Sequence, residues 1–489
     1  MATAAILYDI FEETNYGQHE VVMKSNGSDV VVISDLHLGA GINASYNYDG
    51  TENFFADECF MRFIIYLLEN QKEQKEILII NGDFIDFLRI RNLPELDGDF
   101  TAWKRYLGIV GIGKTEQELK ESISKKEIEY GLKTDDYKSI WKLQRCAIGH
   151  RALFEQLAYW IKEGNKLVIV KGNHDLEWYW PAVRNYLRYM LAELMAKQQD
   201  GNKDDDIGDL VKKGVLFVDD TLIIDERIYV SHGHIYENFT AVNGDATLNN
   251  NTELNLPFGS FFNRYLINRL ELAYPFLDNV RPTQKILPLL IRERFPLAIK
   301  VLFKYIPFTI LIIPKKMYKQ AFKYLFDFLL IIIIPVLITA YAIYTNRGIF
   351  SGNGNTSFIG RQIITIGKNF GFLFLSYILG RIVSMVRLSP PHSLYPFAKD
   401  ILYNKPDIQI VTFGHTHNPE QFNHFNRWYF NTGTWMPVYD VSMADVRIEK
   451  TFTFLHIKHD VTGKINSNEL LRWNDDGMRP ELMILRERK

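Results

Sequence analysis

VVVISDLHLG, residues 30–39, is a short apolar run that ends in an aspartate and a histidine. An unbroken run of Val and Ile of this length is typical of a strand buried on both faces, as in a parallel sheet. Asp35 and His37 follow the carboxyl end of this strand, where sites assemble in open α/β sheets. The stretch therefore predicts an α/β fold with a polar site at a strand end.

Four further segments repeat the arrangement, each with an apolar run before its polar residues: EILIINGDFID (76–86), KLVIVKGNHD (166–175), IYVSHGHIY (228–236) and IQIVTFGHTH (408–417). Helical stretches lie between the early ones, such as ECFMRFIIYLLENQKEQ (58–74) and RALFEQLAYWIKEG (151–164). Strands that alternate with helices predict a layered α/β core.

The five strand ends offer carboxylate, amide and imidazole groups and no thiolate. Such ligands suit divalent ions such as Mn²⁺, Fe²⁺ and Zn²⁺. One histidine at a strand end is usually a structural residue, but five such ends in one chain favour a metal site.

The motifs DLH, GDFID, GNHD, HGH and GHTH resemble, in content and order, the calcineurin-like metallophosphoesterase superfamily, whose pattern is DxH, GDxxD, GNH(D/E), H and GHxH. The resemblance covers residues 30–235 and 408–435. It implies a β-sandwich flanked by helices and two divalent ions, with Mn²⁺ first and Fe or Zn²⁺ as alternatives. The implied ligands of the first ion are Asp35, His37 and His417, those of the second are Asn173, His232 and His415, and Asp83 bridges them. His232 is preferred to His234 because the family's ligand is followed by glycine.

The same resemblance implies that His174 is the catalytic acid and that Asp86 orients it. Two ions can clamp the attacking and leaving oxygens of a phosphoryl group, which leaves His174 to protonate the leaving oxygen. An aspartate that caps a turn is the alternative for Asp86. The protein-phosphatase branch has Arg-Gly after GDxxD, whereas Phe87 and Leu88 stand here, which argues against a Ser/Thr phosphatase.

GIVGIGKT, residues 108–115, also satisfies the Walker A pattern of nucleotide triphosphatases. A P-loop needs a buried strand that leads into its first glycine. The residues before Gly108, TAWKRYL, are polar and typical of a helix. A P-loop protein that binds nucleoside triphosphates and a non-catalytic metal-binding scaffold are the alternatives from other functional classes.

Residues 328–346 are uncharged and mostly apolar, and the run is just long enough to span a bilayer. It lies between His232 and His415, which must meet at one site. An odd number of membrane crossings would place these two histidines on opposite sides of the bilayer, so the number of crossings between them is even. The return leg is 363–386, which contains Lys368 and Arg381. The alternative is a buried helical hairpin in a soluble cap. The lysines before the first leg favour cytoplasmic entry: Lys315, Lys316, Lys319 and Lys323.

We therefore expect three regions. The metallophosphoesterase core begins at 25–240, with a charged insertion at 91–145, and ends at 401–475. Between them lies a hydrophobic helical insertion, 241–400, that anchors the chain at the membrane.

The charges of the chain nearly balance, with 56 Lys and Arg residues against 58 Asp and Glu residues. No electrostatic field of the whole protein therefore favours nucleic acid. The two cysteines exclude a disulfide framework and suit a reducing compartment.

The expected function is hydrolysis of a phosphate ester or pyrophosphate by a membrane-associated protein with a cytoplasmic catalytic domain. If the insertion enters the bilayer, it places the metal centre near lipid headgroups, so a lipid-linked phosphate is the expected substrate. A soluble nucleotide or phosphoprotein substrate is the alternative. The N-terminal residues lack the basic and apolar parts of a secretory signal, in accord with a cytoplasmic domain.

Overall fold

The computed structural model describes residues 16–198 except 49, 204–248, 251–274, 280–281, 286–319 except 314, 393–437, 439–440, 445–446, 450–460, 462–483 and 485, with single positions 322, 367, 370, 371 and 374. Contacts divide the chain into two compact units, one formed by residues 1–300 and 393–489 and the other by residues 301–392.

Two large mixed sheets form the centre of the first unit. The seven-stranded sheet has the order β16 (Arg479–Leu482), β15 (Ile465–Asn474), β14 (Thr453–His459), β2 (Val30–Ile33), β3 (Ile77–Asn81), β4 (Lys166–Val170) and β5 (Val215–Val218). The six-stranded sheet has the order β1 (Glu20–Met23), β6 (Thr221–Ile224), β7 (Ile228–Ser231), β9 (Ile410–Phe413), β11 (Arg427–Asn431) and β10 (Glu420–His424). A small third sheet joins β8 (Val280–Arg281), β12 (Tyr439–Asp440) and β13 (Asp445–Val446).

The two large sheets share one apolar core. Val30 and Val32 of β2 belong to the same buried cluster as Leu222 of β6 and Val230 of β7. Alternate residues of a strand face opposite sides, so Val31 and its neighbours on the other face of the seven-stranded sheet meet the helices. Burial on both faces explains why every residue of β2 is apolar.

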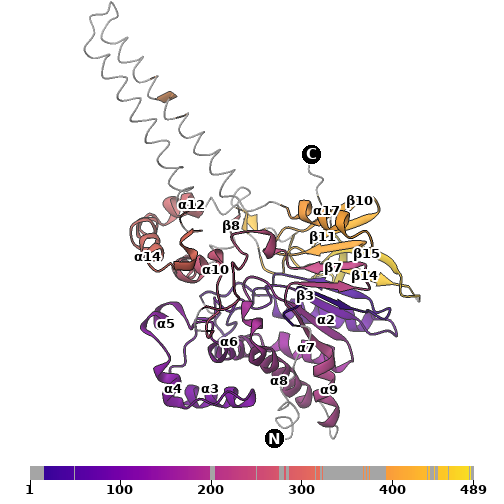
Figure 1. Ribbon diagram of the computed structural model, residues 1–489, viewed down its shortest axis with the longest axis horizontal. Coiled ribbons are helices and arrows are strands. Elements are labelled where there is room, and N and C mark those ends of the chain that lie inside the picture. Colours follow the sequence, from indigo (N-terminus) through magenta and orange to yellow (C-terminus); the bar gives the residue numbers. More distant parts are fainter. Residues whose placement is uncertain are drawn as a thin grey trace, which may run out of the picture. The chain divides into compact units, whose positions relative to one another are not determined.

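Helices cover both outer faces. The seven-stranded sheet packs against α2 (Asp57–Asn70), α6 (Asp136–Gly149), α7 (Arg151–Lys162) and α8 (Pro181–Lys197), while α17 (Tyr395–Asn404) packs against the six-stranded sheet (Figure 1). The predicted α/β class is confirmed, with two mixed sheets and flanking helices.

The charged insertion begins with three helices: α3 (Asp97–Ile109), α4 (Glu116–Glu121) and α5 (Lys125–Tyr130). Gly108 of the Walker A pattern lies inside α3, and Thr115 caps α4 by accepting a hydrogen bond from the Glu118 backbone. The Lys114 ammonium lies 4.5 Å from the centre of the Tyr137 ring. A helix therefore stands where a P-loop requires a strand, which argues against the nucleotide-binding alternative.

The first part of the segment expected as an insertion, residues 254–274, belongs to the first unit. It contains α10 (Phe258–Phe262), a π-helical turn (Asn263–Ile267) and α11 (Asn268–Glu271). The Asn268 side chain donates to the Leu88 carbonyl over 2.7 Å, and Ser260 donates to the Asn173 carbonyl over 3.0 Å. These apolar residues therefore support the loops that carry GDFID and GNHD.

The first unit also contains α9 (Asp204–Gly214), α12 (Ile286–Glu293) and α13 (Phe295–Lys300). The second unit begins with a π-helical turn (Val301–Tyr305) and α14 (Ile306–Leu311). Both predicted membrane legs, 328–346 and 363–386, lie outside the described residues apart from four single positions of the second leg. In the part of the chain that the structure describes, no helix is both long enough and apolar enough to cross a membrane.

A buried histidine in the first unit predicts a pH-dependent stability. His150 Nδ1 lies 2.9 Å from Asp57 Oδ1, and Nε2 lies 3.2 Å from Glu52 Oε2. Burial opposes the charged imidazole, but the two carboxylates outweigh it and raise the pKa of His150 to about 9. Since this exceeds the ordinary 6.5, the stabilisation is complete below pH 6.5 and is lost as pH rises through about 9.

We expect this ion pairing to contribute roughly 3 kcal/mol to the free energy of unfolding, at about 1.4 kcal/mol per pKa unit. Denaturant unfolding of wild type and His150→Gln across the range from neutral to alkaline pH measures it. The difference between the two proteins should shrink as pH rises. A difference that stays constant contradicts the prediction.

Candidate metal centre

The predicted site residues follow five strands whose carboxyl ends point the same way within each sheet. In the seven-stranded sheet β2, β3 and β4 are parallel neighbours. In the six-stranded sheet β7 and β9 are parallel neighbours. The loops after these strands meet at one edge of the stacked sheets, because the carboxyl ends of parallel strands lie at the same edge.

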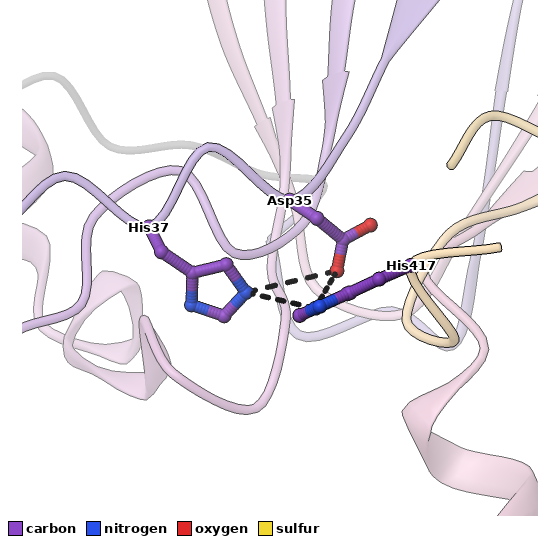
Figure 2. A group of neighbouring side chains, drawn as sticks. All are labelled: Asp35, His37 and His417. Atoms are coloured by element: carbon purple, nitrogen blue, oxygen red, sulfur yellow. Dashed lines mark hydrogen bonds and ion pairs between the residues drawn. The ribbon is translucent and has the colours of Figure 1, made fainter. Parts of the chain in front are cut away.

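Asp35, His37 and His417 form the first group at this edge, and Figure 2 shows their donor atoms turned toward one another. The Nε2 atoms of His37 and His417 are 3.2 Å apart. Asp35 Oδ1 lies 3.2 Å from His417 Nε2 and 3.8 Å from His37 Nε2. Three buried donors that converge on one point form a candidate cation site.

Asp83, His232 and His415 form the second group, with one ligand atom from each within 4.8 Å of the others. Asp83 Oδ2 lies 3.1 Å from His232 Nε2 and also 3.5 Å from His37 Nε2. One carboxylate thus stands between the two groups, where a bridging ligand would be. Asn173 follows β4, and its side chain is buried.

The backbone at these positions is strained. Side-chain-bearing residues seldom have positive φ angles, and each such residue costs on the order of 1–3 kcal/mol. Five of the predicted ligands have φ between 51° and 68°: Asp35, His37, Asp83, His415 and His417. Strain of this kind clusters at functional sites, where the surrounding fold holds it.

Two motif glycines are required by close approach. A Cβ atom on Gly172 would lie 2.1 Å from Asp83 Oδ1, and one on Gly82 would lie 2.3 Å from the His232 ring. Both distances are far shorter than any real contact. The glycines of GDFID and GNHD therefore let neighbouring strand ends close around Asp83 and His232.

Hydrogen bonds orient the imidazoles. His232 Nδ1 bonds the Asn81 carbonyl over 2.8 Å, which turns Nε2 toward Asp83. His415 Nε2 lies 2.8 Å from Glu237 Oε2. Partners of this type fix the tautomer and the ring orientation of histidine ligands. Sequence reasoning missed Glu237, although it stands directly after the strand-end segment 228–236.

Carboxylates and imidazoles shift one another's pKa values. Burial alone would raise the pKa values of Asp35 and Asp83, but neighbouring histidines hold both well below the usual range. Burial lowers the pKa values of His37 and His232, yet the carboxylates raise them to about 10 and about 9. At neutral pH a bound cation would displace these protons, so metal affinity should rise with pH.

Buried donor atoms at the site make no hydrogen bond to the described residues, among them Asn173 Oδ1 and Asp86 Oδ1. Asp35 Oδ1 and His232 Nε2 also make none, and their close contacts are the ion pairs with His417 and Asp83. A buried polar atom without a partner is costly, so such atoms in one place call for an explanation. Divalent cations would bind oxygen and imidazole donors of this kind. The residues therefore fit the dinuclear centre that the motifs imply.

His174 and Asp86 pair at the border of the two groups. His174 Nδ1 lies 2.7 Å from Asp86 Oδ2, and the His174 ring meets the His37 ring edge-on at 4.7 Å. Burial opposes the charged form of His174, but Asp86 and Asp83 raise its pKa. The other proton-bearing nitrogen, Nε2, is thus prepared to give up a proton. Asp86 is buried and bonds side chains at its Oδ2, as expected for an orienting residue.

Behind Asp86 lies a buried ion pair that sequence reasoning missed. Arg89 Nε donates to Asp86 Oδ2 over 3.0 Å, and Arg89 Nη1 donates to Glu271 Oε2. Arg89 and Glu271 are each 1% exposed. One signal was present in the sequence, since Glu271 is the single acid in the apolar stretch FFNRYLINRLELAYPF, 261–276. α11 is therefore linked to Asp86, the partner of His174, through two charged contacts.

Breaking this pair should destabilise the fold. Removal of one partner of a buried ion pair typically costs about 3–5 kcal/mol, because it leaves a buried charge uncompensated. We expect Glu271→Gln to lower the free energy of unfolding by about 3 kcal/mol, measured by urea unfolding. The matched control is Glu226→Gln, whose exposed pair with Lys24 should contribute less than about 1 kcal/mol. Equal losses in both variants contradict the prediction.

A scan against protein-family models and a comparison with curated proteins each found no match for this chain. We therefore infer a function from the motifs and from the chemistry of the site itself.

Proposed function

We propose that the protein is a calcineurin-like, metal-dependent phosphoric ester hydrolase. Its two divalent ions, Mn²⁺ by preference, would be held by Asp35, His37, Asp83, Asn173, His232, His415 and His417. The observation that supports this most is the place of Asp83, whose Oδ2 lies within 3.5 Å of a histidine in each donor group. Two adjacent cation sites that share a carboxylate are typical of enzymes that hydrolyse phosphate esters.

The chemistry divides between the ions and the chain. When bound, the two ions would supply a water of lowered pKa and a clamp for the phosphoryl oxygens. His174, held through Nδ1 by Asp86, presents Nε2 as the proton donor to the leaving oxygen. Arg89 keeps the Asp86 carboxylate in place. A non-catalytic scaffold would have no need for this oriented donor.

The direct test is hydrolysis of p-nitrophenyl phosphate and bis(p-nitrophenyl) phosphate by the purified protein with Mn²⁺. The proposal expects turnover of at least one ester, abolished by a chelator and restored by Mn²⁺. An absence of turnover with Mn²⁺, Fe²⁺ and Zn²⁺ alike would favour a metal-binding scaffold.

For the substrate we propose a phosphate or pyrophosphate on a lipid headgroup, with the catalytic unit on the cytoplasmic side of the membrane. In the second unit Phe303 and Leu311 are 77% and 81% exposed, close in sequence to Lys304 and Lys315. Exposed apolar residues among cations favour an interfacial location. Each lysine near an anionic surface adds about 1 kcal/mol of attraction.

The lipid proposal predicts a split between substrates. With residues 326–387 replaced by a Gly/Ser linker, hydrolysis of a lipid phosphate in vesicles should collapse, while a small soluble ester is still cleaved. The physical reason is that acyl burial, at about 0.8 kcal/mol per CH₂, keeps the lipid phosphate in the vesicle, and the shortened enzyme is no longer held at the vesicle surface. The readout is the ratio of the two rates. An unchanged ratio would show that the segment does not select the substrate and would favour a soluble one.

A further inference from the structure

A second group of possible ligands lies at the opposite ends of the strands that carry Asp35 and Asp83. Asp29 stands immediately before β2, Glu76 immediately before β3, and His456 lies on β14. One ligand atom from each residue lies within 4.8 Å of the other two. The group contains none of the residues of the candidate metal centre.

Strand register brings the three side chains together. β2 and β3 are parallel with Val30 beside Ile77, so Asp29 and Glu76 lie side by side. β14 runs antiparallel to β2 with His456 beside Val31. Residues 29 and 31 share a face of the sheet because side chains alternate along a strand. The fold therefore places an imidazole and two carboxylates on the helix-covered face of three adjacent strands.

Two of these residues have ligand atoms without a hydrogen bond among the described residues. Glu76 is 5% exposed, yet its Oε2 has no partner. His456 Nε2 is also buried and without a partner. Burial and the nearby Asp29 raise the pKa of Glu76 to about 7, and burial lowers the pKa of His456 to about 4. A neutral imidazole with an unused nitrogen therefore faces two carboxylates.

Asp29 already has partners. Its Oδ1 accepts from the His459 backbone over 2.7 Å, and its Oδ2 accepts from Lys72 Nζ over 3.2 Å. The Lys72 side chain is 62% exposed, so its ammonium can leave the group at little cost. Lys458 also acts on this group, since its charge lowers the pKa of both Glu76 and His456. Neither lysine satisfies Glu76 Oε2 or His456 Nε2.

We propose that Asp29, Glu76 and His456 bind one divalent cation of the zinc class. Two carboxylates and one imidazole are a ligand set that Zn²⁺ accepts, with water in the remaining position. Because the ligands come from the amino ends of β2 and β3 and from β14, the ion would join the amino-terminal and carboxy-terminal parts of the seven-stranded sheet. The ion would lie at the amino ends of β2 and β3, whereas Asp35 and Asp83 follow the carboxyl ends of these strands, so it would take no part in the proposed reaction.

The test compares the Zn²⁺ content of wild type, Glu76→Gln and His456→Ala after metal loading and dialysis. We expect each variant to hold one ion fewer per chain than wild type and to lose part of the Zn²⁺-dependent rise in melting temperature. Lys72→Met, which removes the competing ammonium, should bind as many ions as wild type. Because the candidate metal centre is intact in all four proteins, its failure to bind would lower every count equally.

Two outcomes would overturn the proposal. One is the same ion count in wild type, Glu76→Gln and His456→Ala. The other is loss of the ion in Lys72→Met, which would show that the group is an ion-pair network that needs its lysine. Glu76→Gln keeps the shape of the side chain and removes a buried charge, so the metal-free variant should melt no lower than metal-free wild type. This melting comparison shows that any loss of the ion is not a loss of folding.

Discussion

Asp83→Asn should lower kcat for p-nitrophenyl phosphate by roughly 10³-fold or more with Mn²⁺ present. The amide has the shape of the carboxylate but not its charge, and a bound metal contributes several kcal/mol of charge stabilisation at about 1.4 kcal/mol per tenfold. The fold should survive, because Asn can still accept the hydrogen bond that Asp83 Oδ1 receives from the His174 backbone over 2.9 Å.

The control is Asp209→Asn, which makes the same change on the exposed surface of α9, where Asp209 pairs with Lys213. It should retain wild-type turnover. The measurement is initial rate against substrate concentration for the three proteins, with circular dichroism to compare their folding. Wild-type turnover in folded Asp83→Asn would contradict the assignment of Asp83 as the shared ligand.

His174→Ala should lower kcat by about 10²–10⁴-fold on an alkyl phosphate, the usual contribution of a positioned proton donor. The loss should be smaller on p-nitrophenyl phosphate, because p-nitrophenolate leaves without a proton.

Asp86→Asn should change the pH dependence of the rate. Asp86 raises the pKa of His174, so its neutralisation should lower that pKa. The proposed proton donor is the protonated form of His174, so the alkaline limb of the rate profile should move to lower pH.

The substrate comparison separates catalysis from structure. A histidine that only supports the loop would lower both rates by the same factor, whatever the leaving group. Equal losses on the two esters, together with an unmoved alkaline limb in Asp86→Asn, would contradict the role of His174 as the proton donor.

The positions of the predicted ligands could be anticipated because each follows an apolar run. A buried strand dictates Val and Ile, and the polar residues after it are delivered to the sheet edge. Their backbone conformation could not be anticipated in the same way. No local sequence pattern indicated the positive φ angles at Asp35 and His37, or the close approach of Gly172 to Asp83.

The supporting contacts were beyond the reach of local pattern. Arg89 and Glu271 are 182 residues apart in sequence, and no periodicity relates them. Glu271 lies in the stretch 241–400, whose apolar composition predicted an insertion, and residues 254–274 of that stretch belong to the first unit. Composition reports how apolar a segment is and not which surface covers it. The Walker A pattern is a different case, because the residues before Gly108 already predicted a helix, and α3 stands there.

The most direct test of a dinuclear centre is electron paramagnetic resonance of Mn²⁺ added to the metal-free protein. The Glu76→Gln background is used so that the second proposed site does not contribute. We expect the spectrum of an exchange-coupled pair of Mn²⁺ ions, and we expect Asp83→Asn to convert it to the spectrum of isolated ions or to abolish it. Isolated Mn²⁺ at every loading, with no coupled pair, would contradict the dinuclear centre.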